Sequence, residues 1–191
     1  MPDIDIDFAN RNLALDKLKH VAARLDTDKR HNTGVYVQNI PYDPIENIST
    51  IEYKTAEDRG YFKIDFLNVN VYDKVKDRAH LTKLMETEPL WDLLLEDEFT
   101  DKLFHVNGHG SILRRMKPNN IEQLAAILAM IRPAKRHLIG KEWPAVLADV
   151  WVKPENDEYY FKKSHAHSYA ALVVVHMNLL CEKIESGELT L

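Results

Sequence analysis

Three aspartates alternate with apolar residues at the start of the chain, in the stretch Met1-Pro2-Asp3-Ile4-Asp5-Ile6-Asp7-Phe8. In an extended strand successive side chains point to opposite faces, so Asp3, Asp5 and Asp7 are predicted to share one face. Carboxylates placed this closely repel one another unless a positive group lies among them, and a hard divalent cation suits oxygen ligands. The stretch therefore predicts either a Mg²⁺ site or an edge strand whose charges prevent aggregation.

A second stretch, Gly60-Tyr61-Phe62-Lys63-Ile64-Asp65-Phe66-Leu67, has the same alternation. It predicts a strand with Lys63 and Asp65 on one face and apolar side chains on the other. Pairing this strand with the first would bring Asp65 beside Asp3 and Asp5. Carboxylates from two neighbouring strands can hold the paired metal ions used in nucleotidyl transfer.

These two stretches resemble the palm signatures of the alpha subunit of bacterial DNA polymerase III, the C family of DNA polymerases. Three further stretches are similar to that family in the same order along the chain. They are Arg30-His31-Asn32-Thr33-Gly34-Val35, the segment from Met116 to Arg132-Pro133, and Lys163-Ser164-His165-Ala166-His167-Ser168-Tyr169-Ala170. The five matches together span most of the chain.

The resemblance implies an α+β fold, with a small mixed sheet like the nucleotidyltransferase palm of DNA polymerase beta and a helical, fingers-like part after it. Residues 1–95 are expected to form the palm-like region and residues 96–191 the fingers-like region. A chain of 191 residues is much shorter than the polymerases of the family, so a palm with shortened fingers is expected, with a phage origin as one option. The family's Gly-Ser nucleotide-binding turn lies before the first palm signature. Residues 108–111 either replace that turn here or nucleotide binding is impaired.

The resemblance assigns Asp3, Asp5 and Asp65 to catalysis, as ligands of Mg²⁺ or Mn²⁺. The implied reaction joins a dNTP to the 3′-hydroxyl of a primer on template DNA. Asp7 matches a position with an accessory role. A vestigial acidic cluster with no bound metal is the alternative.

Nucleotide or phosphate contact is expected from basic and helix-start residues that match the family: Lys63, Arg132, Lys135, Arg136, Lys163, Ser164 and His165. Weak DNA contact is expected from Lys162 as well. Each has a structural alternative. Lys63 can neutralise excess carboxylates, residues 132–137 can be a solvated basic loop, and Ser164 can simply cap the last helix.

Composition limits these expectations. The net charge is −5 and the isoelectric point is near 6.0, whereas a protein that holds DNA alone usually has a basic surface. Weak DNA binding or dependence on replisome proteins is therefore expected. A second hypothesis is a non-catalytic protein that binds replisome components or DNA and regulates replication.

Periodicity predicts the remaining elements. Helices are expected over 10–25, 67–85, 89–95, 122–130 and 164–180, strands over 34–40 and 51–54, and a loop over 26–33. Cys181 alone excludes a disulfide framework. The longest apolar stretch, from Tyr169 to Leu180, is too short to span a bilayer, so no membrane partner and a cytoplasmic location in a bacterial or phage-infected cell are expected.

Overall fold

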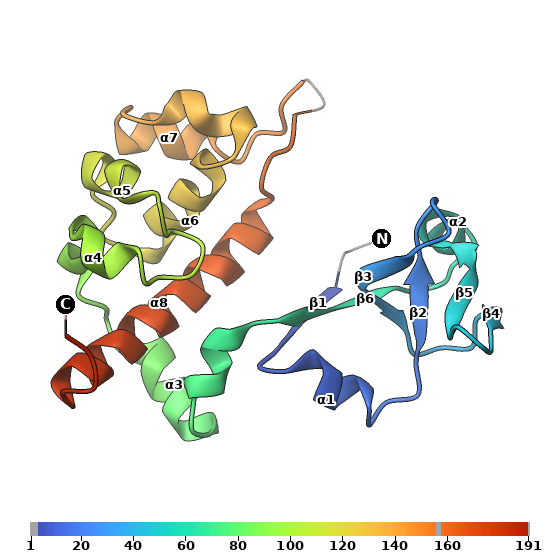
Figure 1. Ribbon diagram of the computed structural model, residues 1–191. Helices are drawn as coiled ribbons and strands as arrows, with labels where there is room; N and C mark the ends of the chain where they lie inside the picture. Colours follow the sequence, from blue (N-terminus) through green and yellow to red (C-terminus); the bar gives the residue numbers. More distant parts are fainter. Residues whose placement is uncertain (1–3, 156–157, 191) are drawn as a thin grey trace. The chain divides into compact units, whose positions relative to one another are not determined.

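The computed structural model describes residues 4–155 and 158–190 and divides the chain into two compact units (Figure 1). Met1–Lys74, here the sheet unit, carries the strands, and Val75–Leu191, here the helical unit, is built from helices. The predicted mixed α+β class is confirmed. The division falls within the region that the sequence assigned to the palm, because residues 75–95 belong to the helical unit.

The sheet unit contains one mixed sheet of six strands, where the sequence predicted four. The strands are β1 Ile4–Phe8, β2 Val21–Arg24, β3 Arg30–Tyr36, β4 Tyr42–Asp43, β5 Ile48–Glu52 and β6 Ile64–Asn68. Their order across the sheet is β1-β6-β3-β2-β5-β4. β1 runs parallel to β6 and β2 parallel to β5, whereas the other neighbours are antiparallel. β1 and β4 are therefore the two edges.

The helix predicted over residues 10–25 is wrong beyond its first turn. Helix α1 covers only Arg11–Leu15, where Asn10 caps it by accepting from the amide of Asn12. The chain then enters β2, in which Ala22 and Ala23 are buried between β3 and β5. Burial in the middle of a sheet outweighs the helical spacing of the same apolar residues.

The loop predicted over 26–33 and the strand predicted over 51–54 are also corrected. β3 begins at Arg30, since its first residues pair with β2. Residues 53–58 form helix α2, Tyr53–Asp58, which Glu52 caps by accepting from the amide of Thr55. Ala56 of this helix packs with Ala23, Tyr36 and Ile40 in a small apolar core of the unit. A short 3₁₀ helix, Asn70–Lys74, ends the unit.

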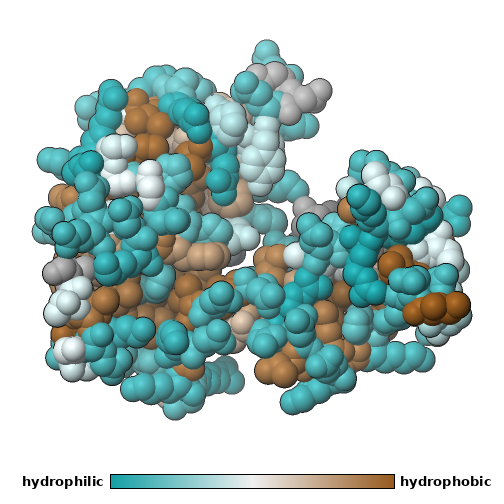
Figure 2. All heavy atoms as spheres, in the orientation of Figure 1, coloured by the Kyte–Doolittle hydropathy of each residue, from teal (hydrophilic) through white to brown (hydrophobic). Residues whose placement is uncertain are grey.

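Part of the apolar surface of the sheet unit stays uncovered near β4 (Figure 2). Ile45 in the turn after this strand is 89% exposed, and Val37 and Tyr42 are about half exposed. A core of this size leaves several large side chains at the surface.

The helical unit surrounds two helices that pack on each other, α6 Ile121–Met130 and α8 Lys163–Glu185. Every residue of α6 from Leu124 to Met130 is buried, as its continuous apolar sequence predicts. The other helices are α3 Arg78–Glu86, α4 Asp97–Thr100, α5 Gly110–Met116 and α7 Trp143–Asp149, with 3₁₀ helices at Trp91–Leu95 and Pro133–Leu138. Within the described residues, no helix has the length and apolar character needed to cross a membrane.

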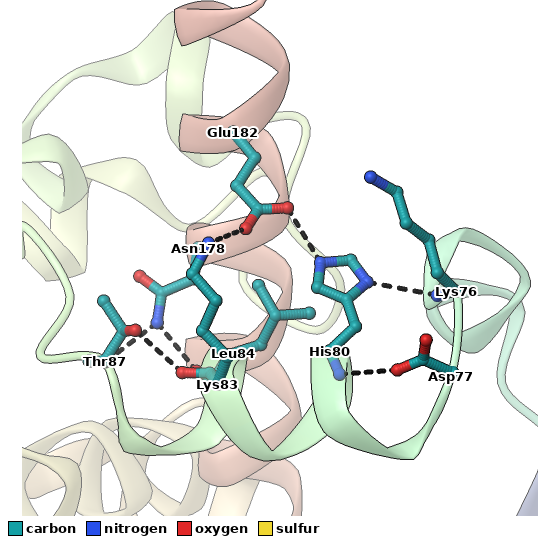
Figure 3. A network of polar contacts seen from close by, with 8 residues as sticks. All are labelled: Lys76, Asp77, His80, Lys83, Leu84, Thr87, Asn178 and Glu182. Atoms are coloured by element: carbon teal, nitrogen blue, oxygen red, sulfur yellow. Dashed lines mark hydrogen bonds and ion pairs between the residues drawn. The ribbon is translucent and has the colours of Figure 1, made fainter.

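Polar contacts attach α3 to α8 (Figure 3). The buried side-chain amide of Asn178 donates to the carbonyl oxygens of Leu84 at 2.8 Å and Thr87 at 2.9 Å, at the end of α3. On the same face of α8, Glu182 accepts from His80 at 2.8 Å and from Lys83 at 2.7 Å. Residues 75–95 join the helical unit because these contacts complete the hydrogen bonding of the last turn of α3.

The Glu182 contacts predict a pH dependence. Hydrogen bonds from Lys83 and then His80 hold the pKa of Glu182 below its ordinary value of 4.5. A lowered carboxyl pKa contributes stability that is present above the unfolded pKa and is lost as pH falls through the folded value. Glu182→Gln should therefore lower the free energy of unfolding at pH 7, and its difference from wild type should shrink below about pH 4.5.

Urea unfolding from pH 3 to pH 7 checks this. Glu188→Gln is a matched control, because Glu188 is exposed and its removal changes the net charge equally. A deficit for Glu182→Gln that stays constant across the pH range would contradict the prediction.

Candidate functional site

The two acidic strands lie side by side as predicted. β1 and β6 are parallel neighbours, and Asp5 is the register partner of Asp65. Directly paired residues leave a sheet on the same side, so these two carboxylates share a face. Asp3, the third predicted ligand, lies outside the described residues.

Asp65 is the most highly connected acidic side chain of this face. Its Oδ1 accepts from the hydroxyl of Thr33 at 2.6 Å, and its Oδ2 accepts from the ammonium of Lys63. The Asp65 side chain is only 13% exposed. Burial alone would raise the pKa of Asp65, but the hydrogen bonds from Lys63 and Thr33 outweigh it and hold the pKa below its ordinary value. The carboxylate is therefore charged and already neutralised by Lys63.

Gly34 makes room for this ion pair. It is the register partner of Asp65 on β3. A Cβ at this position would lie 2.7 Å from Cδ of Lys63 and 3.1 Å from Nδ1 of His31. Only glycine lets the Lys63 chain cross the strand here.

His31 stands beside the pair as a neutral ring. Its Nδ1 accepts from the backbone amides of Gly34 at 2.9 Å and Thr33 at 3.2 Å, so the ring hydrogen is assigned to Nε2. Burial, and then the charge of Lys63, lower the pKa of His31. The 3.7 Å separation between His31 Nδ1 and Asp65 Oδ1 is therefore a contact with a neutral ring and not a salt bridge. The sequence named neither Thr33 nor His31 as a site residue, although both lie in the matched segment 30–35.

Asp7 lies two residues after Asp5 on β1. Burial, and then the charge of Asp5, raise the pKa of Asp7 above its ordinary value. Burial and the charge of Asp7 likewise raise the pKa of Tyr72. Asp7 thus belongs to the electrostatic surroundings of Asp5.

The described residues do not form a complete metal site by themselves. Among residues 4–155 and 158–190 there is no group of three or more His, Cys, Asp or Glu side chains that could hold a metal ion. Asp5 and Asp65 supply two carboxylates on one face, and both oxygens of Asp65 are engaged by Thr33 and Lys63. A divalent ion would need Lys63 to release Asp65 and a further oxygen ligand from outside the described residues.

Lys135, a predicted phosphate contact, is committed to the protein interior. Its side chain is only 4% exposed. Its Nζ donates to the carbonyl oxygen and to Oδ1 of Asp149, both at 2.7 Å. The alternative of a solvated basic loop at residues 132–137 is also corrected, because Pro133–Leu138 forms a 3₁₀ helix and Lys135 connects it to α7.

Helix α8 begins one residue before the predicted start at residue 164, and its N-cap residue also differs from the prediction. The helix begins at Lys163, Lys162 is its N-cap residue without a side-chain capping bond, and Ser164 is therefore not the cap. Nζ of Lys163 lies 3.7 Å from Oε1 of Glu122 and 5.8 Å from the centre of the Trp151 ring. Ser164 is exposed, and its carbonyl oxygen accepts from Ser168.

Arg132 lies in an aromatic and histidine-rich surrounding. Its guanidinium carbon is 5.2 Å from the centre of the Phe161 ring, which itself lies 6.3 Å from the ring of His165. Burial, and then the charge of Arg132, lower the pKa of His105 to about 4. Nε of Arg132 and Nε2 of His105 are buried with no hydrogen-bond partner in the described part of the chain.

Arg136 extends the positive charge of this group. Burial lowers the pKa of His109, and the charges of Arg132 and Arg136 lower it further. The structure thus brings together the residues here called the Arg132 group, which are Arg132, Arg136, His105, His109, Phe161 and His165. Lys135 instead points into the interior. Sequence reasoning missed His105 and Phe161, whose roles depend on contacts between distant segments.

The turn at 108–111 lies against carboxylate side chains. The amide of Gly108 donates to Oδ1 of Asp101 at 3.2 Å. A Cβ on Gly110 would lie 2.2 Å from Oδ1 of Asp97. Asp101 and Asp97 therefore already lie at this turn, and Asp97 is also paired with Arg114.

The predicted site residues fall into two groups, one in each unit. Asp5, Lys63 and Asp65 lie in the sheet unit, and the Arg132 group lies in the helical unit. Neither a protein-family model, nor a curated protein, nor a solved structure shows significant similarity to the chain.

Proposed function

We propose that the chain is a reduced C-family polymerase palm with shortened fingers, which takes part in nucleotidyl transfer to a DNA 3′-hydroxyl. The observation that carries this proposal is the parallel register of Asp5 with Asp65 on neighbouring strands. It aligns the two halves of an acidic pair that are sixty residues apart in the sequence. An edge strand that used its charges only to block aggregation would not need a carboxylate directly opposite on the next strand.

In this proposal Asp3, Asp5 and Asp65 hold Mg²⁺ or Mn²⁺. Bound ions of this kind activate the attacking hydroxyl and neutralise charge on the phosphates. Without a ligand, the ammonium of Lys63 pairs with Asp65. When a nucleotide binds, Lys63 contacts a phosphate oxygen instead. Thr33 keeps Oδ1 of Asp65 oriented through its 2.6 Å hydrogen bond.

The Arg132 group is proposed to contact the triphosphate or the template. Arg132 and Arg136 supply charge, and buried His105 has an unpartnered ring nitrogen within the described residues. Burial and the charges of these arginines lower the pKa values of His105 and His109, so both rings are neutral beside the arginines. The net charge of −5 still opposes DNA, so a replisome partner is expected to supply much of the affinity.

A second candidate function is a non-catalytic protein that binds replisome components or DNA and regulates replication. The Lys63–Asp65 ion pair favours it, because this lysine neutralises the carboxylate that the metal would need. In that case the Lys63–Asp65 ion pair stabilises the sheet, and the carboxylates have no reaction to perform.

Metal-dependent thermal stability tests the first function against the second. Binding to the folded state alone raises the melting temperature, and it also relieves repulsion between the carboxylates. Mn²⁺ or Mg²⁺ should raise the melting temperature of the wild type, and the rise should vanish in Asp5→Asn. Asp26→Asn, which removes an exposed carboxylate of the same unit, should respond like the wild type. Equal responses of Asp5→Asn and wild type would count against the metal site.

A further inference from the structure

A pocket opens in the sheet unit where β2 and β3 diverge. The two strands pair up to Val21 and Tyr36, and beyond this pair neither side continues as a strand. The chain segments 18–20 and 37–40 form the two walls, and Tyr42 and Asn47 complete the lining. The volume is about 540 Å³, which is within the range of small-ligand sites. We call this space the fork pocket.

Among the described residues, the charged side chain that lines the fork pocket is the basic Lys19. Lys19 and His20 belong to its lining, and no aspartate or glutamate does among the described residues. Nδ1 of His20 lies 2.8 Å from the carbonyl oxygen of Leu18, and since a carbonyl can only accept, this nitrogen carries the hydrogen. In a chain with a net charge of −5, a pocket that excludes carboxylates is suited to an anion.

The other lining groups are suited to a planar, hydrogen-bonding ligand. Tyr42 is 46% exposed and offers one aromatic face. The side-chain amides of Gln38 and Asn39 provide both donors and acceptors, whereas that of Asn47 donates to the carbonyl oxygen of His20. A nucleobase has an apolar face for stacking and a polar edge for amides.

We propose that the fork pocket binds one nucleotide unit, with its base on Tyr42 and its phosphate at Lys19. The inference deepens the proposed function and rests on it for the use of the bound nucleotide. The pocket shares no residue with the acidic pair or the Arg132 group. A peptide is the competing occupant, but residues 37–41 are not a strand and provide no ladder for an added one.

Fluorescence anisotropy of a labelled ten-residue oligothymidylate with the full chain tests this proposal, in EDTA so that metal plays no part. Tyr42→Leu keeps an apolar side chain but removes the stacking face, and it should weaken binding at least about fivefold. Tyr42→Phe keeps the ring and should bind like the wild type. Tyr159→Leu removes an exposed tyrosine outside the pocket and is the matched control.

Lys19→Gln tests the phosphate contact. It should weaken binding and reduce the salt dependence, by about 0.7 in the slope of log K against log salt for one phosphate contact on a single strand. Lys17→Gln removes a neighbouring exposed lysine that does not line the pocket, and it should leave the slope unchanged. Competition by thymidine monophosphate would show that one free nucleotide suffices, and its failure to compete would assign the pocket to a single strand. Both outcomes support the proposal.

Unchanged binding in Tyr42→Leu and Lys19→Gln would overturn it. So would absence of nucleotide binding together with Tyr42-dependent binding of a tetrapeptide of alternating glutamate and leucine, which would assign a protein partner. Asp5→Asn should bind the oligonucleotide like the wild type under these conditions. Failure of the fork pocket and failure of the metal site are therefore distinguishable.

Discussion

Asp5→Asn and Asp65→Asn should each abolish DNA synthesis by this chain. Primer extension at low salt with Mn²⁺ is expected to be weak for the wild type, because a net charge of −5 opposes the approach of DNA. Loss of a metal ligand should reduce this weak rate by at least about 100-fold. Substitution of a residue that only hydrogen-bonds to a metal ligand already lowers metal affinity or activity by about 10- to 100-fold. Single-turnover extension by one nucleotide, with excess protein, measures the effect.

Asp26→Asn is the matched control, because it makes the same charge change at an exposed position of the sheet unit. Asp65→Asn also leaves Lys63, whose side chain is 19% exposed, without its carboxylate and should destabilise the fold. The assay is therefore run well below the melting temperature of each variant. Robust, processive synthesis by the wild type alone would contradict the expected dependence on a partner.

Absence of synthesis and of nucleotide binding in the wild type would favour the regulatory function. The Lys63–Asp65 pair would then be a structural ion pair. Lys63→Met distinguishes the catalytic from the regulatory function. It removes the ammonium that competes with a metal ion for Asp65, while keeping most of the side-chain volume. If metal binds at Asp65, this variant should bind Mn²⁺ at least as tightly as the wild type, although it loses a phosphate contact.

Asn178→Ala should lower the free energy of unfolding by about 2 kcal/mol or more, because it leaves two acceptor groups of α3 without a donor. Asn178 is 6% exposed, and its amide donates to the carbonyl oxygens of Leu84 and Thr87. Urea unfolding measures the change, and hydrogen exchange of the α3 amides locates it. Helix α3 should lose protection before α6 does.

Asn107→Ala is the control, because Asn107 is an exposed asparagine of the same unit. Asn178→Leu retains volume but not the donors, so it should recover little of the lost stability. A free energy of unfolding for Asn178→Ala within 0.5 kcal/mol of the wild type, the usual range for surface substitutions, would show that Asn178 does not hold α3.

The sequence by itself determined the features that depend on local pattern. Alternation over residues 1–8 and 60–67 predicted two strands with a common acidic face, and β1 and β6 pair in register over the described part, although β6 begins only at Ile64. The continuous apolar run in α6 identified the buried centre of the helical unit. Strand faces and helix burial follow from the spacing of apolar and polar residues along the chain, which can be read directly from the sequence.

Only the tertiary structure decided which elements compete for the same residues and which charges are already paired. Residues 21–24 have helical spacing but form a strand, because β3 and β5 flank them. Lys135 and Arg136 are adjacent in the sequence, yet Asp149 holds the first inside the protein and the second is exposed. Asp65 is fixed by Thr33, which lies 32 residues earlier. Such outcomes depend on the free energy of contacts between distant segments, which the spacing of neighbouring residues in the sequence does not reveal.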